Sequence, residues 1–173
     1  MIQPYNSIHF DHHAYMNIAL TLARKAAAWG EVPVGALVVH RPTPTEAYII
    51  SKAFNLREHT QDPSAHAEIL ALRQASEVLG QWRLINCDLY VTLEPCLMCA
   101  GAVVNARISR VIYGCDDYKA GACHSLYQIL SDHRLNHRAE IIKHIQKKPC
   151  QHVLQTFFQA RRIQNKKRRT HTK

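Results

Sequence analysis

The sequence predicts an α/β protein in which helices cover both faces of one sheet. Short apolar runs rich in valine and isoleucine alternate with longer segments whose apolar residues recur every three or four positions. Such alternation is typical of a layered α/β/α domain. The length of 173 residues suits one domain with a buried core. Because no internal repeat or linker divides the chain, we expect a single domain over residues 1–160, followed by a basic arm over residues 161–173.

The expected elements follow from the periodicity of apolar residues and from the glycines and prolines between them. They are, in chain order, a helix over 11–29, a buried strand over 34–39, a turn over 41–46, an antiparallel strand over 47–51, a polar loop over 54–62, a helix over 62–79, a strand over 88–92, a helix over 96–106, a strand over 110–113, a short helix over 126–130, a strand over 140–145 and a final helix over 151–167. Asp62 and Pro63 are expected to begin their helix, because an acceptor side chain and a proline suit its first two positions.

Two short motifs carry the chemistry of the chain. His66 and Glu68 form a His-x-Glu motif, and Cys96 and Cys99 form a Cys-x-x-Cys motif directly after Pro95. Each motif lies where a helix is expected to begin. Unpaired N–H groups and the helix dipole favour negative charge at such a position and lower the pKa of a thiol. Two thiolates and one imidazole are ligands that zinc commonly takes in proteins.

These three ligands predict a catalytic zinc site. A catalytic zinc keeps one coordination position for water, whereas a structural zinc takes four protein ligands. Glu68 is expected to point elsewhere around its helix than His66 and to move a proton without binding the metal. Two alternatives stay open from the residues alone: a redox pair of cysteines, or a structural zinc site with a fourth ligand from Cys87, Cys115 or Cys123.

The cysteines outside the motif receive no role of their own. Cys87, Cys115, Cys123 and Cys150 are scattered through ordinary segments, and in a reducing compartment such residues usually serve packing. The chain has no apolar run of about 18 residues. Its N-terminus has no basic segment followed by an apolar one. We therefore expect a cytoplasmic protein that does not associate with a membrane.

The positive charge is concentrated at the C-terminus. The formal net charge is +9, and residues 161–173 hold seven basic residues and no acidic one, so the rest of the chain is nearly neutral. A run of this kind is often a solvated, partly disordered tail. Clustered lysines and arginines also bind the phosphate backbone of nucleic acids. The charge alone does not decide between these two roles.

Both motifs lie within longer stretches that carry a family resemblance. The stretches are EVPVGALVV (31–39), Asn55, DPSAHAEILALRQ (62–74), RLINCDLYVTLEPCLMCAGA (83–102), RISRVIYG (107–114), DYKAGA (117–122), NHRAEI (136–141) and FFQARR (157–162). The combination of His-x-Glu with Pro-Cys-x-x-Cys is the signature of zinc-dependent nucleobase deaminases. From about Tyr15 to Arg162 the chain resembles the bacterial tRNA-specific adenosine deaminase (TadA) family of the cytidine deaminase superfamily.

The resemblance implies the cytidine deaminase fold, a three-layer α/β/α arrangement with a central mixed five-stranded sheet. It implies one Zn²⁺ per subunit and a homodimer whose active sites lie near the subunit interface. The reaction that it implies is hydrolytic deamination of adenosine to inosine at the wobble position of a tRNA anticodon, typically that of the arginine tRNA with anticodon ACG. A zinc-activated water would attack C6 of the flipped-out adenine.

The same resemblance assigns roles to individual residues. It implies His66, Cys96 and Cys99 as zinc ligands, Glu68 as the catalytic proton carrier, Asn55 and Val34 at the target base, Asp117 and Lys119 at the flanking nucleotides, and Phe157, Phe158, Arg161 and Arg162 at the anticodon loop. Aromatic and cationic side chains suit a splayed single-stranded loop. By position alone, Asn55 could instead be a loop cap, Asp117 and Lys119 a solvated turn, and the two phenylalanines core residues.

Departures from the family pattern concern the substrate side. Asp116 stands where relatives can carry a basic residue, and Cys123-His124 interrupts a run of small residues. Two other functions compete with tRNA deamination. A deaminase of a free base or nucleoside would share the zinc motif, but it would not need a basic arm. A zinc or RNA-binding protein without activity would have no use for Glu68.

Overall fold

The fold is built on one mixed sheet of five strands in the order β2-β1-β3-β4-β5. The strands are β1 (Gly35–His40), β2 (Tyr48–Phe54), β3 (Cys87–Leu93), β4 (Arg110–Cys115) and β5 (Glu140–Lys143). β1 pairs antiparallel with β2 and β3, whereas β3, β4 and β5 run parallel. The computed structural model describes residues 11–171, with the side chains of residues 11–168. The predicted α/β class and the mixed five-stranded sheet are confirmed.

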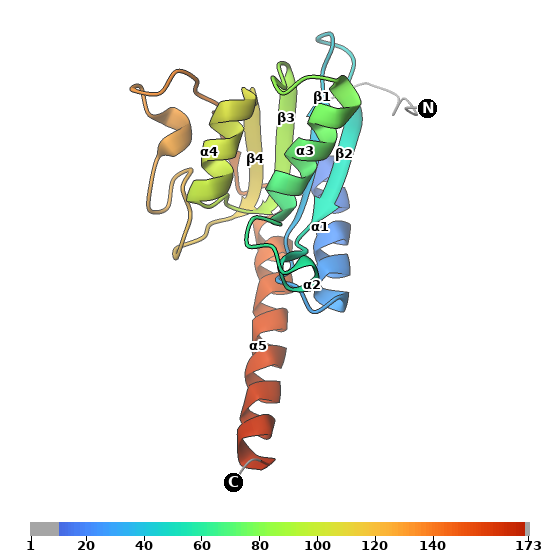
Figure 1. The fold of residues 1–173 in the computed structure, drawn as a ribbon, viewed down its shortest axis with the longest axis vertical. Helices are drawn as coiled ribbons and strands as arrows, with labels where there is room; N and C mark the ends of the chain where they lie inside the picture. The colour runs from blue at the N-terminus through green and yellow to red at the C-terminus, as the bar shows by residue number, and fades with distance from the viewer. Residues whose placement is uncertain (1–10, 172–173) are drawn as a thin grey trace.

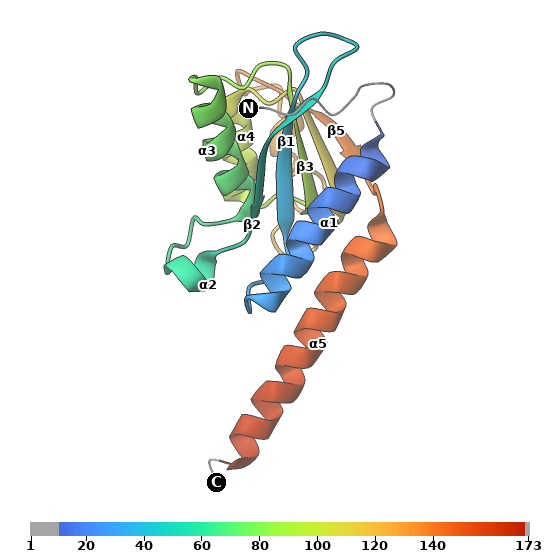
Figure 2. The same cartoon turned by 90° about the vertical axis from the view of Figure 1, so that its right-hand side faces the viewer.

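Helices cover both faces of this sheet (Figures 1 and 2). They are α1 (His12–Ala28), α2 (Arg57–Thr60), α3 (Ala67–Leu79), α4 (Leu97–Ala106), the 3-10 turn η1 (Ile129–Ser131) and α5 (Lys147–His171). Figure 2 shows α3 and α4 on one face and α1 with the first part of α5 on the other. The second part of α5 extends past the end of the sheet in both views.

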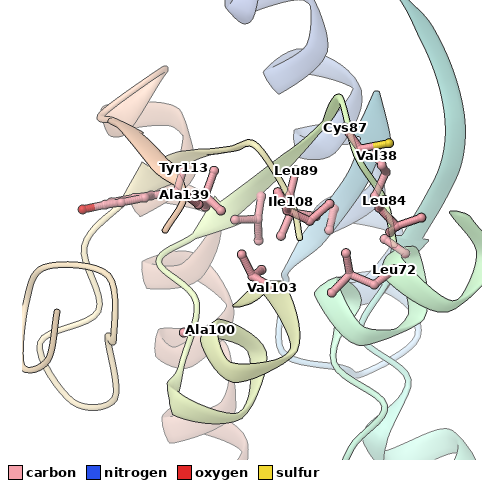
Figure 3. Close-up of a cluster of buried hydrophobic side chains, with 14 of the residues drawn as sticks. Val38, Leu72, Leu84, Cys87, Leu89, Ala100, Val103, Ile108, Tyr113 and Ala139 are labelled. Carbon is pink, nitrogen blue, oxygen red and sulfur yellow. The ribbon is translucent and has the colours of Figure 1, made fainter. Parts of the chain in front are cut away.

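Strand β1 illustrates how the core forms on both faces of the sheet. Ala36 and Val38 belong to the apolar cluster beneath α3 and α4, part of which Figure 3 shows. Leu37 and Val39 point the other way and pack with Met16 of α1. A strand buried on both faces has a continuous apolar sequence, which explains the valine-rich run. Burial of each such aliphatic side chain contributes about 1.5–3 kcal/mol to stability.

The strand directions determine where the functional loops lie. β2 and β3 both run antiparallel to β1, so their carboxyl ends lie at the same edge of the sheet. β4 and β5 run parallel to β3, so their carboxyl ends lie at that edge too. The segments that follow β2, β3, β4 and β5 therefore gather at one edge, together with the residues that precede β1. Ligands of α/β sheets usually bind outside the carboxyl ends of strands.

The start of α3 differs from the prediction. Asp62 and Pro63 do not begin the helix, since α3 begins at Ala67 with His66 as its N-cap. The Asp62 carboxylate instead accepts hydrogen bonds from the N–H and hydroxyl groups of Ser64, both at 2.7 Å. An aspartate can close such a local turn as readily as it caps a helix. The turn leaves His66 in an extended conformation, at the entrance to the helix.

Other elements differ from the prediction in length. The loop over 54–62 contains the single-turn helix α2, the second strand runs on to Phe54, and the expected helix over 126–130 is reduced to η1. α5 begins at Lys147, four residues early, and continues through residue 160 to His171 without a break. Within residues 11–171, no helix has the length and apolar character needed to cross a bilayer. The predicted absence of a secretory signal concerns mainly residues 1–10, which lie outside the described residues.

Candidate metal centre and substrate cavity

Two helix N-termini meet at the edge of the sheet where the carboxyl ends of β2 to β5 lie. His66 is the N-cap of α3 and Cys96 is the N-cap of α4. Both residues are extended, with ψ near 149° and 176°, and neither makes a capping hydrogen bond with its side chain. The prediction that both motifs lie at helix starts is confirmed. The orphan N–H groups and dipoles of the two helices favour negative charge at this point.

Three ligand atoms converge between these helix starts. Nδ1 of His66 lies 3.7 Å from Sγ of Cys96 and 3.5 Å from Sγ of Cys99. Zinc–sulfur bonds of about 2.3 Å and a zinc–nitrogen bond of about 2.0–2.1 Å at tetrahedral angles place sulfur and nitrogen roughly 3.6 Å apart. The measured separations fit that geometry. His66, Cys96 and Cys99 therefore form a zinc site.

The ligand count decides against a structural zinc site. Among the described residues, the cluster able to hold a metal consists of His66, Cys96 and Cys99. The three cysteines considered as a fourth ligand, Cys87, Cys115 and Cys123, are buried elsewhere with free thiols. Three protein ligands leave a coordination position for water, which is the catalytic pattern.

The two thiols differ in acidity. Hydrogen bonds from the thiol of Cys99 and from His66 lower the pKa of Cys96 to about 4, against the effect of burial. The pKa of Cys99 is raised, because its thiol donates to Cys96 and is buried. The two shifts have one cause, because the adjacent thiols share a proton that Cys99 holds and Cys96 accepts.

A cavity of about 210 Å³ adjoins the ligands. Residues from the segment before β1, from the segments after β2 and β4, and from both motifs line it, among them Val34, Asn55, His66, Glu68, Cys96 and Asp117. Glu68 is buried and is not a member of the ligand cluster. Burial raises the pKa of its carboxyl to about 7, while His66 acts in the opposite direction. Perturbed carboxyls in a cavity are typical of functional sites.

Asn55 connects the cavity to the start of α3. Its side-chain oxygen accepts a hydrogen bond from the N–H of Ala67 at 2.9 Å, and the residue is buried. Asn55 therefore has the capping role that its position in the sequence allowed as an alternative to substrate binding. Asn55 also lines the cavity, so one residue both caps α3 and forms part of the cavity wall. Val34, also buried, forms part of the apolar wall.

Sequence reasoning missed Glu94. This buried carboxylate accepts hydrogen bonds from the backbone N–H groups of Asp117, Cys123, His124 and Ser125, at 2.7–3.1 Å, and from the Ser125 hydroxyl. Burial acts to raise the pKa of Glu94, but these hydrogen bonds outweigh it and the pKa is lowered. The carboxylate thus holds the loop after β4 beside the metal ligands. A charged residue between a buried strand and Pro95 was the available signal, because such a carboxylate must find donors.

Glycine is required where this loop approaches Glu94. A Cβ atom at Gly121 would collide with the Glu94 carboxylate, and its contact with the carbonyl of Asp117 would be only 2.5 Å. Gly121 also forms a β-bridge with Cys96. The small residue therefore lets the loop approach the zinc ligands closely.

The two residues expected at the flanking nucleotides lie in different environments. Asp117 lines the cavity. Its carboxylate accepts hydrogen bonds from the backbone N–H groups of Lys119 and Ala120, at 2.9 and 3.3 Å. The side chain of Lys119 is exposed and does not line the cavity described here. Asp117 therefore shapes the turn as well as the cavity wall.

Asp116 faces away from the cavity. Its carboxylate lies 2.8 Å from Nε2 of His144 and accepts a hydrogen bond from Nζ of Lys147, also at 2.8 Å. Burial acts to raise the pKa of Asp116, but the bonds from Lys147 and His144 lower it to about 2. This departure from the family pattern ties the loop after β4 to the first turn of α5.

The residues expected at the anticodon loop lie on α5. Phe157 is half-buried and lines a shallow groove with Arg24 and Ala27 of α1, whereas the Phe158 side chain is 42% exposed. Their rings meet edge to face at 5.5 Å, and the Arg161 guanidinium lies 5.5 Å from the Phe157 ring. Neither phenylalanine is a core residue, because α5 leaves the sheet at this point. Arg161 and Arg162 are exposed.

The comparisons with known proteins agree with this site. A family model described as MafB19-like deaminase matches residues 10–162. The "tRNA-specific adenosine deaminase" of Haemophilus influenzae is 45% identical over 151 residues, which cover 87% of this chain and 85% of the relative. The protein of the same name from Bacillus subtilis is 43% identical over 152 residues, with coverage of 88% and 91%. The chain belongs to the tRNA-specific adenosine deaminase family.

Solved structures place this adenosine deaminase family member among deaminases of one fold. A structure from "Biochemical and Structural Studies of A-to-I Editing by tRNA:A34 Deaminases at the Wobble Position of Transfer RNA" superposes with a TM-score of 0.75 at 39% identity, covering 82% of this chain and 99% of that one. Guanine deaminase from Bacillus subtilis gives 0.55 at 37% identity, over 62% and 66% of the two chains. Guanine deaminase from Nitrosomonas europaea, 21% identical with a TM-score of 0.73, shares the fold.

Removal of one zinc ligand tests the metal site of this family member. We expect the purified protein to hold one zinc ion per chain and Cys96→Ala to lose it, because two ligands do not form a stable zinc site. Elemental analysis of the purified proteins measures the zinc content. Cys123→Ala is the matched control, since Cys123 is buried nearby and lies outside the cluster. Equal loss of zinc in both variants would contradict the assignment.

Proposed function

We propose that the protein is a zinc-dependent hydrolase that deaminates adenosine to inosine at the wobble position, position 34, of tRNA anticodons. One observation carries the proposal. A three-ligand zinc site with a buried, non-ligating carboxylate occurs in a chain that is 45% identical over 151 residues to a tRNA-specific adenosine deaminase. A structural zinc site would have no use for that carboxylate.

The reaction converts adenosine and water to inosine and ammonia. When bound, zinc lowers the pKa of a water molecule and so supplies a nucleophile near neutral pH. Glu68 is proposed to take a proton from the attacking water, deliver it to N1 of adenine and then assist departure of the C6 amino group as ammonia. Its burial beside His66 keeps the carboxyl out of bulk water and within the cavity.

The cavity is proposed to hold one flipped-out adenine. The NH₂ group of Asn55 would donate a hydrogen bond to the base or its sugar, and Val34 would contact the apolar face of the ring. Asp117 and Lys119 would contact the flanking nucleotides from the loop that Glu94 holds in place. The arginine tRNA with anticodon ACG is the proposed substrate. A tRNA substrate would place the reaction in the cytoplasm.

The basic arm is proposed to be an RNA-binding extension of a single catalytic domain that spans residues 1–160. α5 continues through the start of the arm as one helix, with exposed side chains at residues 161–168. Phe158, Arg161 and Arg162 would contact the anticodon loop, and the later basic residues would contact phosphates farther along the RNA. The side chains of residues 169–171 and all of residues 172–173 lie outside the described residues.

An apolar patch beside the zinc ligands supports a homodimer. Leu97 and Met98, in the first turn of α4, are 47% and 39% exposed, and Leu126 and Tyr127 are 51% and 48% exposed. The backbone N–H groups of Leu126 and Tyr127 both bond to the carbonyl of Gly121, which pairs with Cys96. Leu97 and Met98 lie between the two cysteine ligands in the chain, and Gly121 links Leu126 and Tyr127 to Cys96 through backbone pairing. A second copy of the chain would cover these four side chains and bring two active sites close to the interface.

Deamination of a free base is the second candidate function. It is favoured by the 37% identity to guanine deaminase from Bacillus subtilis. That match covers 62% of the chain, whereas the match to the tRNA-specific enzyme of Haemophilus influenzae covers 87%. The match to the tRNA-specific enzyme is both longer and higher in identity, so tRNA is the favoured substrate.

The zinc-loaded protein should form inosine in the ACG arginine tRNA and leave free adenosine and guanine unchanged. Mass spectrometry of the digested RNA and chromatography of the free compounds would measure both. Glu68→Gln should retain zinc and lose on the order of 10²–10⁴-fold in kcat, because the carboxyl no longer carries protons. Conversion of guanine without conversion of tRNA would overturn the proposed function. Full activity of Glu68→Gln would overturn only the role of this residue.

Charge removal from the arm tests its contact with RNA. Replacing Lys166, Lys167 and Arg168 by Gln should weaken tRNA binding and lower its salt dependence, by about 0.7–0.9 in the log–log slope for each lost phosphate contact. Filter binding at several salt concentrations measures the slope. A control triple replaces the exposed Lys52, Arg73 and Arg83, which lie in β2, in α3 and just after α3. An arm without RNA contacts would give the same slope in both triples.

Disruption of the apolar patch tests the homodimer. We expect the protein to have the mass of a dimer in light scattering after size-exclusion chromatography. Leu97→Lys combined with Leu126→Lys should convert it to a monomer, because two buried charges would lie unpaired in the interface. Val78→Lys, on a residue that is 47% exposed near the end of α3, is the control. A monomeric wild-type protein would contradict the proposal.

A further inference from the structure

An exposed aromatic cluster lies outside the cavity and takes no part in the chemistry described above. Its centre is Trp29, the C-cap of α1, whose side chain is 51% exposed. The Trp29 ring meets Phe54, at the end of β2, nearly edge to face at 5.6 Å, and it lies 5.0 Å from the ring of His59 in α2. Three separate elements thus contribute rings to one surface.

A lysine lies beside the rings of the cluster, and a buried carboxylate holds α2 in place. Nζ of Lys25, one turn earlier in α1, lies 5.9 Å from the Trp29 ring and 5.0 Å from the Phe54 ring. The buried Glu31 carboxylate accepts a hydrogen bond from the backbone N–H of His59 at 2.8 Å, which ties α2 to the segment after α1. The indole of Trp29 therefore contacts Phe54, His59 and Lys25, and about half of its surface stays accessible.

The cluster is continuous with the rim of the cavity. Phe54 directly precedes Asn55, and Arg57 at the start of α2 lines the cavity together with Asn55 and Glu68. α2 leads from Arg57 at the cavity to His59 beside Trp29. Figure 1 shows α2 and the end of α1 toward the same end of the sheet as the start of α3. A chain that places one unit in the cavity can thus reach the aromatic surface with a neighbouring unit.

Aromatic faces with adjacent cations are the usual means of holding unpaired bases. Bases stack on such rings whatever their sequence, and nearby lysine and arginine neutralise the phosphates. Lys25 and Arg57 supply positive charge here, and Glu58 on α2 is the exposed acidic residue nearby. A base that enters the cavity must leave the stack, which frees its neighbours for new stacking partners. The surface therefore fits single-stranded RNA next to the target nucleotide.

We propose that Trp29, with Phe54, His59 and Lys25, forms a stacking platform for an unpaired base of the RNA whose target adenosine occupies the cavity. The proposal rests on the proposed function, because it takes the substrate to be an anticodon loop. Trp29 is a binding residue for a neighbouring base and does not touch the reacting atoms. Its loss should therefore raise KM for RNA and leave kcat at saturating RNA unchanged.

The chain supplies its own control. It has two tryptophans, and the second, Trp82, is 59% exposed with the Arg83 guanidinium 4.6 Å from its ring. Trp82 follows the C-cap of α3, Gly80, whereas the cavity lies at the other end of that helix. A helix of 13 residues is about 20 Å long. Trp82 therefore combines a similar exposure and an adjacent cation with a position far from the cavity.

Tryptophan fluorescence separates the two sites. Trp82→Phe leaves Trp29 as the reporter, and its emission should be quenched as an ACG anticodon stem-loop RNA is added. Trp29→Phe leaves Trp82, whose emission should not change. A fully paired RNA of the same length should quench neither, since it offers no unpaired base. Unchanged Trp29 emission at saturating stem-loop RNA would overturn the proposal.

Affinity and turnover give the second readout. Trp29→Ala should weaken stem-loop binding about 10-fold or more and raise KM by a similar factor. Trp29→Phe should recover part of this loss of affinity. Trp82→Ala should bind the RNA as the wild-type protein does. Zinc content and circular dichroism check that each variant is folded. Wild-type KM in Trp29→Ala, with inosine still formed, would overturn the platform and leave the proposed function intact. Failure of the wild-type protein to convert any tRNA would instead overturn the proposed function.

Discussion

The convergence of two helix N-termini at one sheet edge is the constraint on which the rest of the structure depends. β2 and β3 both run antiparallel to β1, so α3 and α4 begin side by side after them. Only this arrangement brings Nδ1 of His66 within 3.5–3.7 Å of two cysteine sulfurs that lie 30 and 33 residues away in the chain. Because both helix dipoles favour negative charge there, the same edge stabilises thiolates and attracts a cation between them.

A second carboxylate, Glu94, organises the substrate side of the cavity. Glu94 stands two residues before the ligand Cys96 in the chain. Its carboxylate accepts hydrogen bonds from backbone N–H groups within residues 117–125. The metal centre and the loop that carries Asp117 are therefore parts of one hydrogen-bonded unit. Asp116 extends the unit to α5 through His144 and Lys147. A shift of the loop would disturb both the cavity wall and the base of the basic helix.

The proposed RNA-binding groups outside the cavity and the proposed catalytic carboxyl within it occupy different parts of the molecule. The cavity is small and holds the buried carboxyl of Glu68, whereas Trp29, His59 and the aromatic and basic residues of α5 lie outside it. Deaminases that share this fold differ in substrate, as the guanine deaminases among the similar structures illustrate. One fold can thus serve different substrates when the elements around the site change.

The sequence by itself determined the elements of the sheet and the chemistry of the site. Periodicity located the strands and most helices, and the short spacings within His66-x-Glu68 and Cys96-x-x-Cys99 predicted a zinc site with a carboxylate that does not bind the metal. The sequence did not place the start of α3 correctly, because an aspartate such as Asp62 can close a local turn as well as cap a helix. Only the tertiary structure decided the double role of Asn55, the hydrogen bonds of Glu94 and the meeting of Trp29 with His59. These contacts join residues that are distant in the chain, and local patterns carry no information about such pairs.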